Sequence, residues 1–583
     1  MTFSDLSHYF GTLEETASRN RMTEILADLF AHSHKDEIGK ICYLLQGRVA
    51  PLYEAVEFGV ADKFIIRAIA QAYGVDKKQV MQVFKKEGDL GKAAQESHSR
   101  HGNASLTVKE VYERLFDITQ AGGVGSQEKK ITLLAELLRS VDGLSARYVA
   151  RIPLNKLRLG FSDMTILDAL SWMLTGDKSL RPKLENAYNV RPDIGFIAET
   201  VKEHGIKGLS SVKAKVGAPI LASLCQRLPN ADEMIKKMGK VAVEPKYDGV
   251  RVAIHFQERE KVRTFSRNLE NTTAMFPELQ TIGKQLHAHE VILDSEAVGM
   301  DPKTGKLIPF QETMTRKRKH DIEITRGNVP LKFFVFDILY KDGKDLLSLP
   351  LSERRKILET TIKMLDSRNQ SSPDSGNPSK NILVISPQIV TDSADEIRKY
   401  HDEQLKKGLE GAVVKKWDSP YEPGRRGYSW VKFKEEEGKT GKLTDTIDAV
   451  VMGYYRGEGK RTGFGIGAFL VGVGDGESFV TVTKVGTGVS DELWKELRKR
   501  LNDLKVTKQP KEYDKVNKIF IPDVWVVPKL VVEIAGDDLT KSPTHGAGIA
   551  VRFPRLVRIR DDKSPNDITT TKEVEQMYTQ QGK

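Results

Sequence analysis

A lysine beside an Asp-Gly turn is the residue of this sequence whose type and setting best fit chemistry. Lys246 stands in the run Glu244-Pro245-Lys246-Tyr247-Asp248-Gly249-Val250-Arg251, between segments of strand-like composition. Because Asp-Gly favours a tight turn, the lysine amine can project from a β scaffold into a cleft. Lys-x-Asp-Gly alone is most often an ordinary surface turn, so other motifs must decide whether this lysine is a nucleophile.

Further short blocks downstream carry charged residues on strand-like segments. Each block puts charge at the end of, or alternating along, an apolar run, so that several charged side chains can converge on one pocket. Solvated surface strands rarely give such repeated convergence. In chain order the blocks are Ser266-Arg267-Asn268, Asp294-Ser295-Glu296-Ala297-Val298, Phe334-Val335-Phe336-Asp337, Glu410-Gly411-Ala412-Val413-Val414-Lys415, Ser429-Trp430-Val431-Lys432-Phe433-Lys434, and the strongly basic run from Arg552 to Lys563.

The first two hundred residues predict a helical module. Thr107-Val108-Lys109-Glu110 is a capping-box pattern, and apolar residues at helical spacing follow it. Apolar residues recur at helical spacing over 131–138 and again over 166–173. Ser162 or Asp163 can cap the helix expected over the second of these ranges. This part of the chain therefore predicts an all-α domain, which we place at 1–210.

The rest of the chain has two further patterns of apolar and turn-forming residues. From about Val241, short β-rich runs and a helix expected over 351–364 predict an α+β domain at 211–440, with a surface loop over 367–380. From about Thr446, strands separated by glycine turns predict a small β-barrel at 441–583. The expected strands are 250–256, 291–293, 332–340, 382–385 and 412–415, then 447–455, 464–474, 479–485 and 524–534.

Composition narrows the class of protein. A chain of 583 residues should hold roughly three or four domains. No window is apolar enough to span a membrane, and the first residues lack the layout of a signal peptide, so we expect a cytoplasmic protein. Two cysteines, Cys42 and Cys225, allow at most one disulfide and exclude a cysteine-built zinc site. The net charge of +11 favours polyanionic partners such as nucleic acid or acidic membranes.

In their order, the charged blocks resemble the motifs of the covalent nucleotidyltransferase superfamily, which comprises ATP-dependent DNA ligases, RNA ligases and mRNA capping enzymes. The resemblance implies that Lys246 takes AMP from ATP as a phosphoramidate, which provides a leaving group for joining a 5′-phosphate to a 3′-hydroxyl. The amine must be neutral to attack, and we expect partial burial and nearby cations to favour that form.

The resemblance also assigns roles to the other motif residues. Glu244 would read the adenine edge and Phe336 would stack on the base. Glu296 would bind a ribose hydroxyl and, with Glu410, would hold Mg²⁺, with Mn²⁺ as an alternative. The remaining assignments are Arg251 and Arg267 for the ribose and phosphates, Arg426, Lys432 and Lys434 for the α-phosphate region, and Arg558, Arg560 and Lys563 for the departing pyrophosphate.

Each assignment has a plainer alternative. Phe336 alternates with Phe334 and Ile338, as a core residue would. Glu410 precedes a glycine and fits an exposed turn, while Lys434 begins the charged run Lys434-Glu435-Glu436-Glu437. The three basic residues near the C-terminus fit a role on a DNA backbone or a solvated surface as well as pyrophosphate handling.

The helical N-terminal part of the chain favours one branch of the superfamily. Asn155 to Asp163, followed by Thr165 to Leu170, resembles a signature of the helical DNA-binding domain in archaeal and eukaryotic replicative DNA ligases. Lys156 and Arg158 would contact phosphates there without reading bases. The alternative is a helix-loop-helix with two solvated basic residues. Ser295 departs from the family pattern, in which glycine is common, but it has no proposed catalytic role.

The sequence therefore predicts a multidomain, monomeric DNA ligase that seals nicked duplex DNA in replication, repair and recombination, using ATP and Mg²⁺. We expect the barrel to be an OB fold and the enzyme to associate with the nucleoid. The rivals are an RNA ligase or capping guanylyltransferase, which GTP labelling or RNA-only sealing would favour, and a scaffold that has lost the chemistry. Contact with a sliding clamp and use of ADP, GTP or NAD⁺ stay open, with NAD⁺ improbable as the main donor.

Overall fold

The computed structural model describes residues 1–98, 105–258, 260–301, 304, 306–308, 330–363, 381–425, 427–433, 446–457 and 459–580, without the side chains of 459, 460 and 462. The chain separates into two compact units, Met1–Lys434 and Glu435–Lys583. The expected loop over 367–380 lies outside the described residues.

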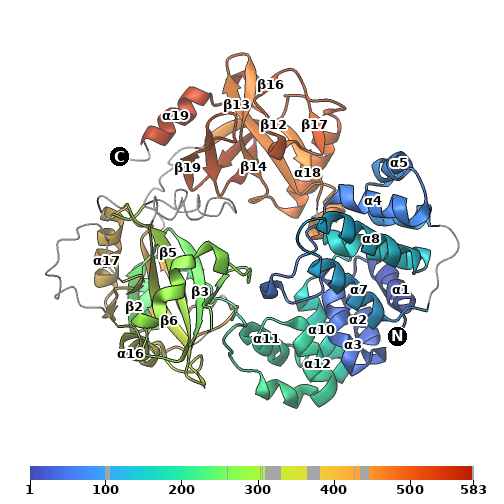
Figure 1. The fold of residues 1–583 in the computed structure, drawn as a ribbon. Helices are drawn as coiled ribbons and strands as arrows, with labels where there is room; N and C mark the ends of the chain where they lie inside the picture. The colour runs from blue at the N-terminus through green and yellow to red at the C-terminus, as the bar shows by residue number, and fades with distance from the viewer. Residues whose placement is uncertain are drawn as a thin grey trace. The chain divides into compact units, whose positions relative to one another are not determined.

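The N-terminal region is helical, as predicted (Figure 1). Thr107 and Glu110 form the expected capping box, with the Glu110 amide donating to Thr107 Oγ1 over 3.2 Å. Ser162 precedes a helix, but its side chain makes no capping hydrogen bond. The helices are α1 Phe3–Glu14, α2 Arg19–His32, α3 Lys35–Leu45, α4 Asp62–Tyr73, α5 Lys77–Glu87, α6 Leu90–Ser97, α7 Val108–Gln120, α8 Ser126–Arg139, α9 Gly143–Arg151, α10 Asp163–Thr175, α11 Arg181–Val190 and α12 Ile194–His204.

The central region is α+β and contains two sheets. The first has the strand order β1-β11-β10-β2-β9, and the second has the order β4-β3-β5-β6-β7 with β8 parallel to β6. The elements are β1 Gln226–Arg227, α13 Ala231–Met238, β2 Val241–Pro245, β3 Val250–Gln257, β4 Arg263–Ser266, β5 Glu290–Gly299, β6 Leu331–Lys341, β7 Lys344–Asp345, α16 Leu351–Thr361, β8 Leu383–Ile385, β9 Ile389–Thr391, α17 Ala394–Lys406, β10 Ala412–Lys416 and β11 Trp430–Phe433.

Helices cover one face of each central sheet. Apolar residues of α13 and α17 pack on β2, β10 and β11, and α16 packs on β6. The two sheets meet where Phe336 of β6 approaches Trp430 of β11, with ring centroids 5.9 Å apart in an edge-on arrangement. The expected helix over 351–364 ends at Thr361, because Ile362 is extended and pairs with Leu286.

The C-terminal unit is a strongly bent, mostly antiparallel β domain of the OB type, in which β16 runs parallel to β14. Its main sheet has the order β15-β17-β12-β13-β14-β16, and β18 pairs with both β12 and β21. Register shifts interrupt three of these pairings, which lets the sheet curl around the core that contains Trp494. The elements are β12 Ile447–Tyr455, β13 Ala468–Asp475, β14 Ser478–Val485, α18 Asp491–Asn502, β15 Lys505–Val506, β16 Tyr513–Asp514, β17 Val524–Val526, β18 Val531–Ala535, β19 Asp538–Lys541, β20 Ile549–Arg552, β21 Arg555–Ile559 and α19 Thr571–Gln580.

Two strand predictions in this unit need correction. The expected strand 524–534 is two strands, β17 and β18, because Pro528 between them has no N–H for the ladder. The expected strand 464–474 begins only at Ala468, since Gly459–Phe464 form a 3₁₀ helix. Both breaks are local and leave the order of the sheet intact.

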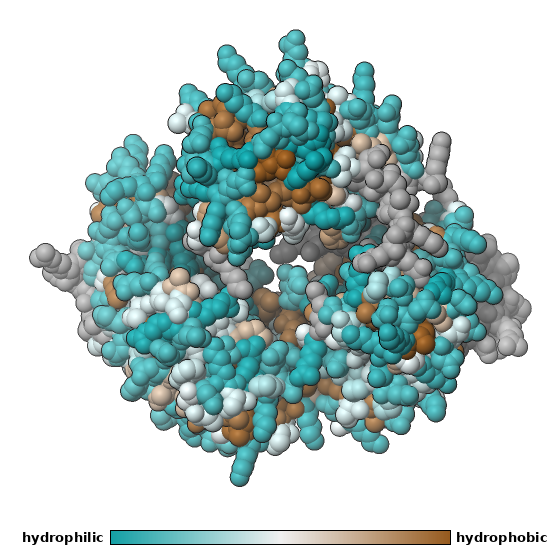
Figure 2. All heavy atoms as spheres, turned by 180° about the vertical axis from the view of Figure 1, so that it is seen from behind, coloured by the Kyte–Doolittle hydropathy of each residue, from teal (hydrophilic) through white to brown (hydrophobic). Residues whose placement is uncertain are grey.

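The surface is largely hydrophilic, and the two cysteines are not paired with each other. Hydrophilic residues cover most of the face shown in Figure 2. Within the described part of the chain, no helix is both long and apolar enough to cross a membrane. Cys42 is buried and Cys225 is half-buried, and both thiols are free.

Candidate functional site

Lys246 lies directly after β2, and Glu410 lies two residues before β10. The Lys246 amide donates to Gly411 O over 2.9 Å, and the Glu410 amide donates to Lys246 O over 3.2 Å, so the backbone fixes the two residues side by side. The Lys246 ammonium forms an ion pair with the Glu410 carboxylate, and each side chain is about one-fifth exposed. The amine is thus held in place and reachable from solvent.

Strand register gathers charged side chains on one face of the first central sheet. Glu244 of β2 lies opposite Val413 of β10, which in turn lies opposite Lys432 of β11, while Lys415 lies opposite Trp430. Residues directly opposite one another share a sheet face, as do residues two apart on a strand. Glu244, Lys415, Trp430 and Lys432 therefore share one face.

Glu244 and Lys415 form a buried ion pair at the back of this face. Lys415 Nζ lies 2.9 Å from Glu244 Oε1, and the two side chains are only 2% and 3% exposed. The ammonium also lies 4.6 Å from the ring centroid of Phe336 and 4.3 Å from that of Trp430. Burial raises the pKa of the Glu244 carboxyl, and the charge of Lys415 opposes that shift.

The second central sheet contributes Arg251 and Asp294. Arg251 of β3 donates to the two oxygens of Asp294 on β5 over 3.0 and 2.6 Å, and to Ser223 O over 2.7 Å. The guanidinium lies 5.5 Å from the ring centroid of Phe336, which is half-buried. Arg251 therefore borders the aromatic pocket, but in this structure most of its hydrogen bonds go to protein groups.

The carboxylate of Glu296 has no hydrogen-bond or ion-pair partner among the described residues. Glu296 lies opposite Arg251 in the β3–β5 ladder. Burial raises the pKa of its carboxyl to about 8, although the charges of Arg251 and Lys246 act in the opposite direction. Such a carboxylate is suited to accept a cation or a hydroxyl group.

The turn after Lys246 packs against the strand that carries Glu296, which explains its glycine. A Cβ atom at Gly249 would come within 2.5 Å of Ala297 O and 2.9 Å of Glu296 Cγ. No larger residue fits there without moving the turn. Gly249 thereby keeps the nucleophile candidate on the first sheet close to Glu296 on the second.

Two carboxylates fit the requirements of Mg²⁺. Glu296 and Glu410 both lie near Lys246, and Mg²⁺ is commonly bound by one or two carboxylates together with substrate phosphates and waters. Among the described residues no group of three or more His, Cys, Asp or Glu side chains could hold a metal ion without such help. The two carboxylates therefore suit a cation that is also bound by the phosphates of a nucleotide.

The other assigned residues of the central region differ in their surroundings. Arg267 is exposed in the turn after β4 and lines a narrow pocket together with Arg251, Asp294 and Tyr421. Lys432 is half-buried on β11, near the Glu244 face. Arg426 and Lys434 lie outside the described residues.

The basic residues near the C-terminus pair with carboxylates of their own unit. Arg558 on β21 donates to Glu533 Oε2 over 2.6 Å. Arg560 binds both oxygens of Asp448 over 2.9 and 3.2 Å, and Lys563 donates to Asp448 Oδ2 over 2.6 Å. An anionic ligand at these side chains would have to exchange with the carboxylates.

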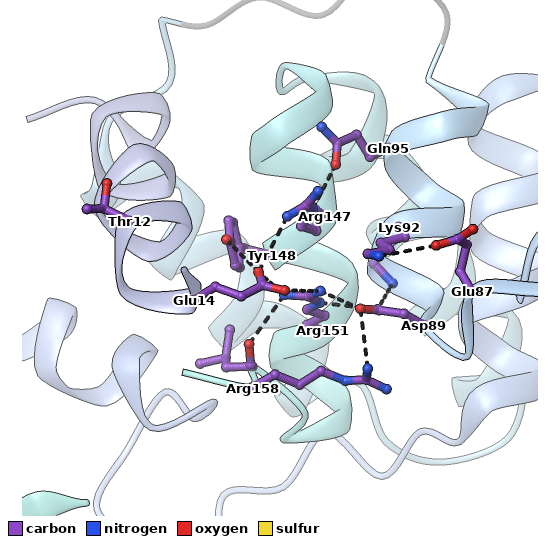
Figure 3. Close-up of polar contacts among 12 residues, drawn as sticks. Thr12, Glu14, Glu87, Asp89, Lys92, Gln95, Arg147, Tyr148, Arg151 and Arg158 are labelled. Carbon is purple, nitrogen blue, oxygen red and sulfur yellow. Dashed lines mark hydrogen bonds and ion pairs between the residues drawn. The ribbon is translucent and has the colours of Figure 1, made fainter. Parts of the chain in front are cut away.

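Lys156 and Arg158 lie on the loop between α9 and α10. Lys156 Nζ lies 3.2 Å from Asp62 Oδ1, and both side chains are largely exposed. Arg158 donates to Gly88 O over 2.7 Å, and Figure 3 shows its guanidinium beside Asp89 at the turn before α6. Both cations can thus be reached from solvent, which suits contacts with phosphates.

Two important residues received no role from the sequence. Lys415 was noted only as the end of a motif block, although a lysine closing the apolar run Ala412-Val413-Val414 is unusual for a buried strand. Arg151 has no such signal, because its carboxylate partners, Glu14 and Asp89, lie far away in the sequence.

Comparison with known proteins covers nearly the whole chain. Family models match at residues 2–171 (DNA ligase N terminus), 219–434 (ATP dependent DNA ligase domain) and 462–563 (ATP dependent DNA ligase C terminal region). A probable DNA ligase of Dictyoglomus thermophilum is 43% identical over 594 residues, covering 100% of this chain and 98% of the relative. A DNA ligase of Saccharolobus solfataricus is 38% identical over 611 residues, with the same coverage of both chains.

A solved structure supports the fold along most of the chain. The structure titled Pmar-Lig_Pre has a TM-score of 0.54 and 17% identity, covering 96% of this chain and 99% of its own. This likeness concerns the fold alone, whereas the family follows from the sequence relatives and the matching models. The helical, α+β and β-barrel regions are matched by models of one enzyme family, and the chain belongs to the ATP-dependent DNA ligase family.

Proposed function

We propose that the chain seals nicks in duplex DNA through a covalent lysine adenylate. Lys246 Nζ attacks the α-phosphorus of ATP, a P–N bond forms, and pyrophosphate leaves. The AMP then passes to the 5′-phosphate of a nick, and the 3′-hydroxyl attacks that phosphate and expels AMP. The observation that carries this proposal is the lysine itself, which backbone hydrogen bonds hold beside Glu410 and whose side chain is about one-fifth exposed.

The pocket supplies a chemical reason for adenine recognition. Lys415 stabilises Glu244 as a carboxylate, which can only accept hydrogen bonds and therefore suits the amino group of adenine. The partly exposed ring of Phe336 offers a face for the base. We assign the phosphates to Lys432 and Arg267, together with Arg426 and Lys434. Arg251 borders the ribose.

Glu296 and Glu410 would hold Mg²⁺, with Mn²⁺ as the alternative. The cation, when bound, would neutralise negative charge on the triphosphate. Glu410 already binds the Lys246 ammonium, so any cation that competes for this carboxylate weakens the ion pair and frees the lysine side chain to approach the nucleotide. Glu296 remains to bind the cation or a ribose hydroxyl.

The remaining regions would engage DNA. Lys156 and Arg158 of the helical region, proposed as 1–210, would contact phosphates of the nicked duplex. The central domain, 211–440, would carry the chemistry. In the barrel domain, 441–583, Arg558, Arg560 and Lys563 would exchange their carboxylate partners for pyrophosphate. A monomer acting in the cytoplasm, at the nucleoid, in replication, repair and recombination fits this assignment.

Labelling with ATP tests the proposal directly. The protein is incubated with α-³²P-labelled ATP and Mg²⁺, resolved on a denaturing gel, and chased with nicked duplex DNA. We expect a covalent band in the wild type and in the matched control Lys236→Ala, whose side chain is exposed on α13, and at least a thousandfold weaker band in Lys246→Ala. The chase should remove the label and seal the nick.

Other outcomes redirect the assignment. A band that persists in Lys246→Ala would refute the nucleophile. Label from GTP, or discharge by RNA ends alone, would identify a capping guanylyltransferase or an RNA ligase. Absence of label with every nucleotide would leave a nucleic-acid-binding scaffold.

A further inference from the structure

Arg151 is a fully hydrogen-bonded cation of the helical region. It is the last residue of α9 and is 1% exposed. Its guanidinium donates to Glu14 over 2.8 and 3.0 Å, to Asp89 Oδ1 over 3.2 Å and to the other Asp89 oxygen, and to Leu157 O over 3.3 Å. Figure 3 shows this cluster between α1, α6 and α9. Each N–H group of the guanidinium therefore has an acceptor.

The acceptor at Leu157 links this cluster to the proposed DNA surface. Leu157 lies between Lys156 and Arg158, and its carbonyl is the contact of Arg151 with that loop. The Lys156 amide also donates to Arg151 O over 3.2 Å. Arg151 thus holds the backbone between the two cations assigned to DNA phosphates.

The loop has a backbone conformation that needs outside support. Asn155 and Arg158 have φ values of 52° and 62°. These values lie in the left-handed region, which residues other than glycine rarely adopt. Such conformations persist where the surrounding structure fixes them. Around Arg158, two such contacts are the Arg151 bond to Leu157 O and the Arg158 bond to Gly88 O, while the Asn155 amide donates to Ile152 O over 2.9 Å.

A close helix approach places the carboxylate partner. A Cβ atom at Gly91 would come within 2.6 Å of Arg147 O and 2.7 Å of Arg151 Cγ, so α6 packs on α9 without an intervening side chain. Asp89 caps α6 by accepting from the Gly91 amide over 2.8 Å and also binds Arg151. Burial alone would raise the pKa of the Asp89 carboxyl, but Arg151 lowers it below its usual value.

We propose that Arg151 is a positioning residue for DNA binding, which fixes the 155–160 loop so that Lys156 and Arg158 meet successive phosphates without an ordering cost. This inference rests on the proposed function, because it requires those two residues to contact DNA. Arg151 itself is buried and touches no phosphate. Its effect on DNA must therefore pass through the loop.

Arg151→Lys separates positioning from charge. Lysine keeps a positive charge between Glu14 and Asp89 but lacks the planar fork that reaches Leu157 O at the same time. The matched control is Arg181→Lys, the same substitution at another ion-paired arginine of the helical region, which binds Asp168 and Glu185. Binding of full-length protein to nicked duplex DNA is measured over a salt series, and thermal unfolding is measured for each variant.

We expect Arg151→Lys to raise the Kd for nicked DNA about tenfold and to lower the magnitude of the log–log salt slope by about one to two. The control should lower the unfolding midpoint without changing Kd or slope. If both variants weaken DNA binding in proportion to their loss of thermal stability, Arg151 has only a structural role and the inference fails. It fails equally if Arg151→Lys binds DNA as the wild type does.

A double-mutant cycle gives the stricter test. In a background of Lys156→Ala with Arg158→Ala, Arg151→Lys should cause no further loss of affinity, because nothing remains to be positioned. Additive losses would overturn the inference. If the Lys156→Ala, Arg158→Ala variant alone binds nicked DNA as the wild type does, the loop is not a DNA contact, and the failure lies in the proposed function. Self-adenylylation of the wild type checks the catalytic part of that function separately.

Discussion

The central pocket and the 155–160 loop both present lysine and arginine side chains, but in opposite environments. Lys415 and Glu244 are 2% and 3% exposed, whereas Lys156 and Asp62 are 54% and 41% exposed. A charge pair removed from water is fixed in place and costly to disrupt, while an exposed pair exchanges partners readily. Buried pairs suit a site that must recognise one nucleotide, and exposed cations suit a surface that must accept any DNA sequence.

The largest expected effect is the loss of stability when the buried Lys415–Glu244 ion pair is broken. Lys415→Met leaves Glu244 in the pocket without its cation, which should lower the free energy of unfolding by about 3–5 kcal/mol. Urea titration followed by tryptophan fluorescence measures it. Lys156→Met is the matched exposed control and should cost under about 1 kcal/mol. Equal losses in the two variants would remove the contrast between the regions.

Titration of Glu296 should have a smaller effect on the free energy of unfolding, and this effect should depend on pH. The Glu296 pKa of about 8 lies above the ordinary 4.5, so between these values the folded chain holds a proton that the unfolded chain lacks. Stability should therefore fall as pH rises from about 4.5 towards 8, by on the order of 1–2 kcal/mol after solvent screening. Thermal unfolding across pH measures this slope, which Glu296→Gln should abolish.

Added Mg²⁺ sharpens the same experiment. If Glu296 helps to bind the cation, Mg²⁺ with a non-hydrolysable ATP analogue should stabilise the wild type more than Glu296→Gln, with the difference growing as pH rises. A pH slope that persists in Glu296→Gln would assign the titration to another group.

The exposed loop should give the smallest effect per residue, and this effect is on DNA binding. Lys156→Ala and Arg158→Ala should each weaken binding to nicked duplex by a few-fold and lower the magnitude of the salt slope by about one. Filter binding between low and physiological salt measures both. Unchanged slopes would show that these cations do not replace counterions on the duplex.

The sequence predicted the modules and the motif strands because both depend on local periodicity. The capping box at Thr107 and the β12 strand, for example, follow from short patterns. The ion pairs could not be predicted, since they depend on register and on helix approach. Lys415 meets Glu244 across 171 positions, and Arg560 meets Asp448 across 112. The break at Pro528 was readable, because proline is confined to edges and ends of strands.

Arg251 illustrates the limit at the level of one side chain. Its place in the motif indicated substrate contact, but the sequence contained no sign that Asp294 would lie within 2.6 Å on the neighbouring strand. The position of Arg251 in its motif indicated which strand carries it. Only the packed sheet shows that protein groups already accept most of its hydrogen bonds.

The complete hydrogen bonding of the Arg151 guanidinium has a consequence for protein design. Because its donors are divided among α1, the turn before α6 and the 155–160 loop, the loop is not a portable segment. Grafting residues 155–160 alone onto another helical scaffold would transfer a sequence without the shape it needs. A transplant would have to include Glu14, Asp89, Gly91 and Arg151 as one unit, with the helices that bring them together.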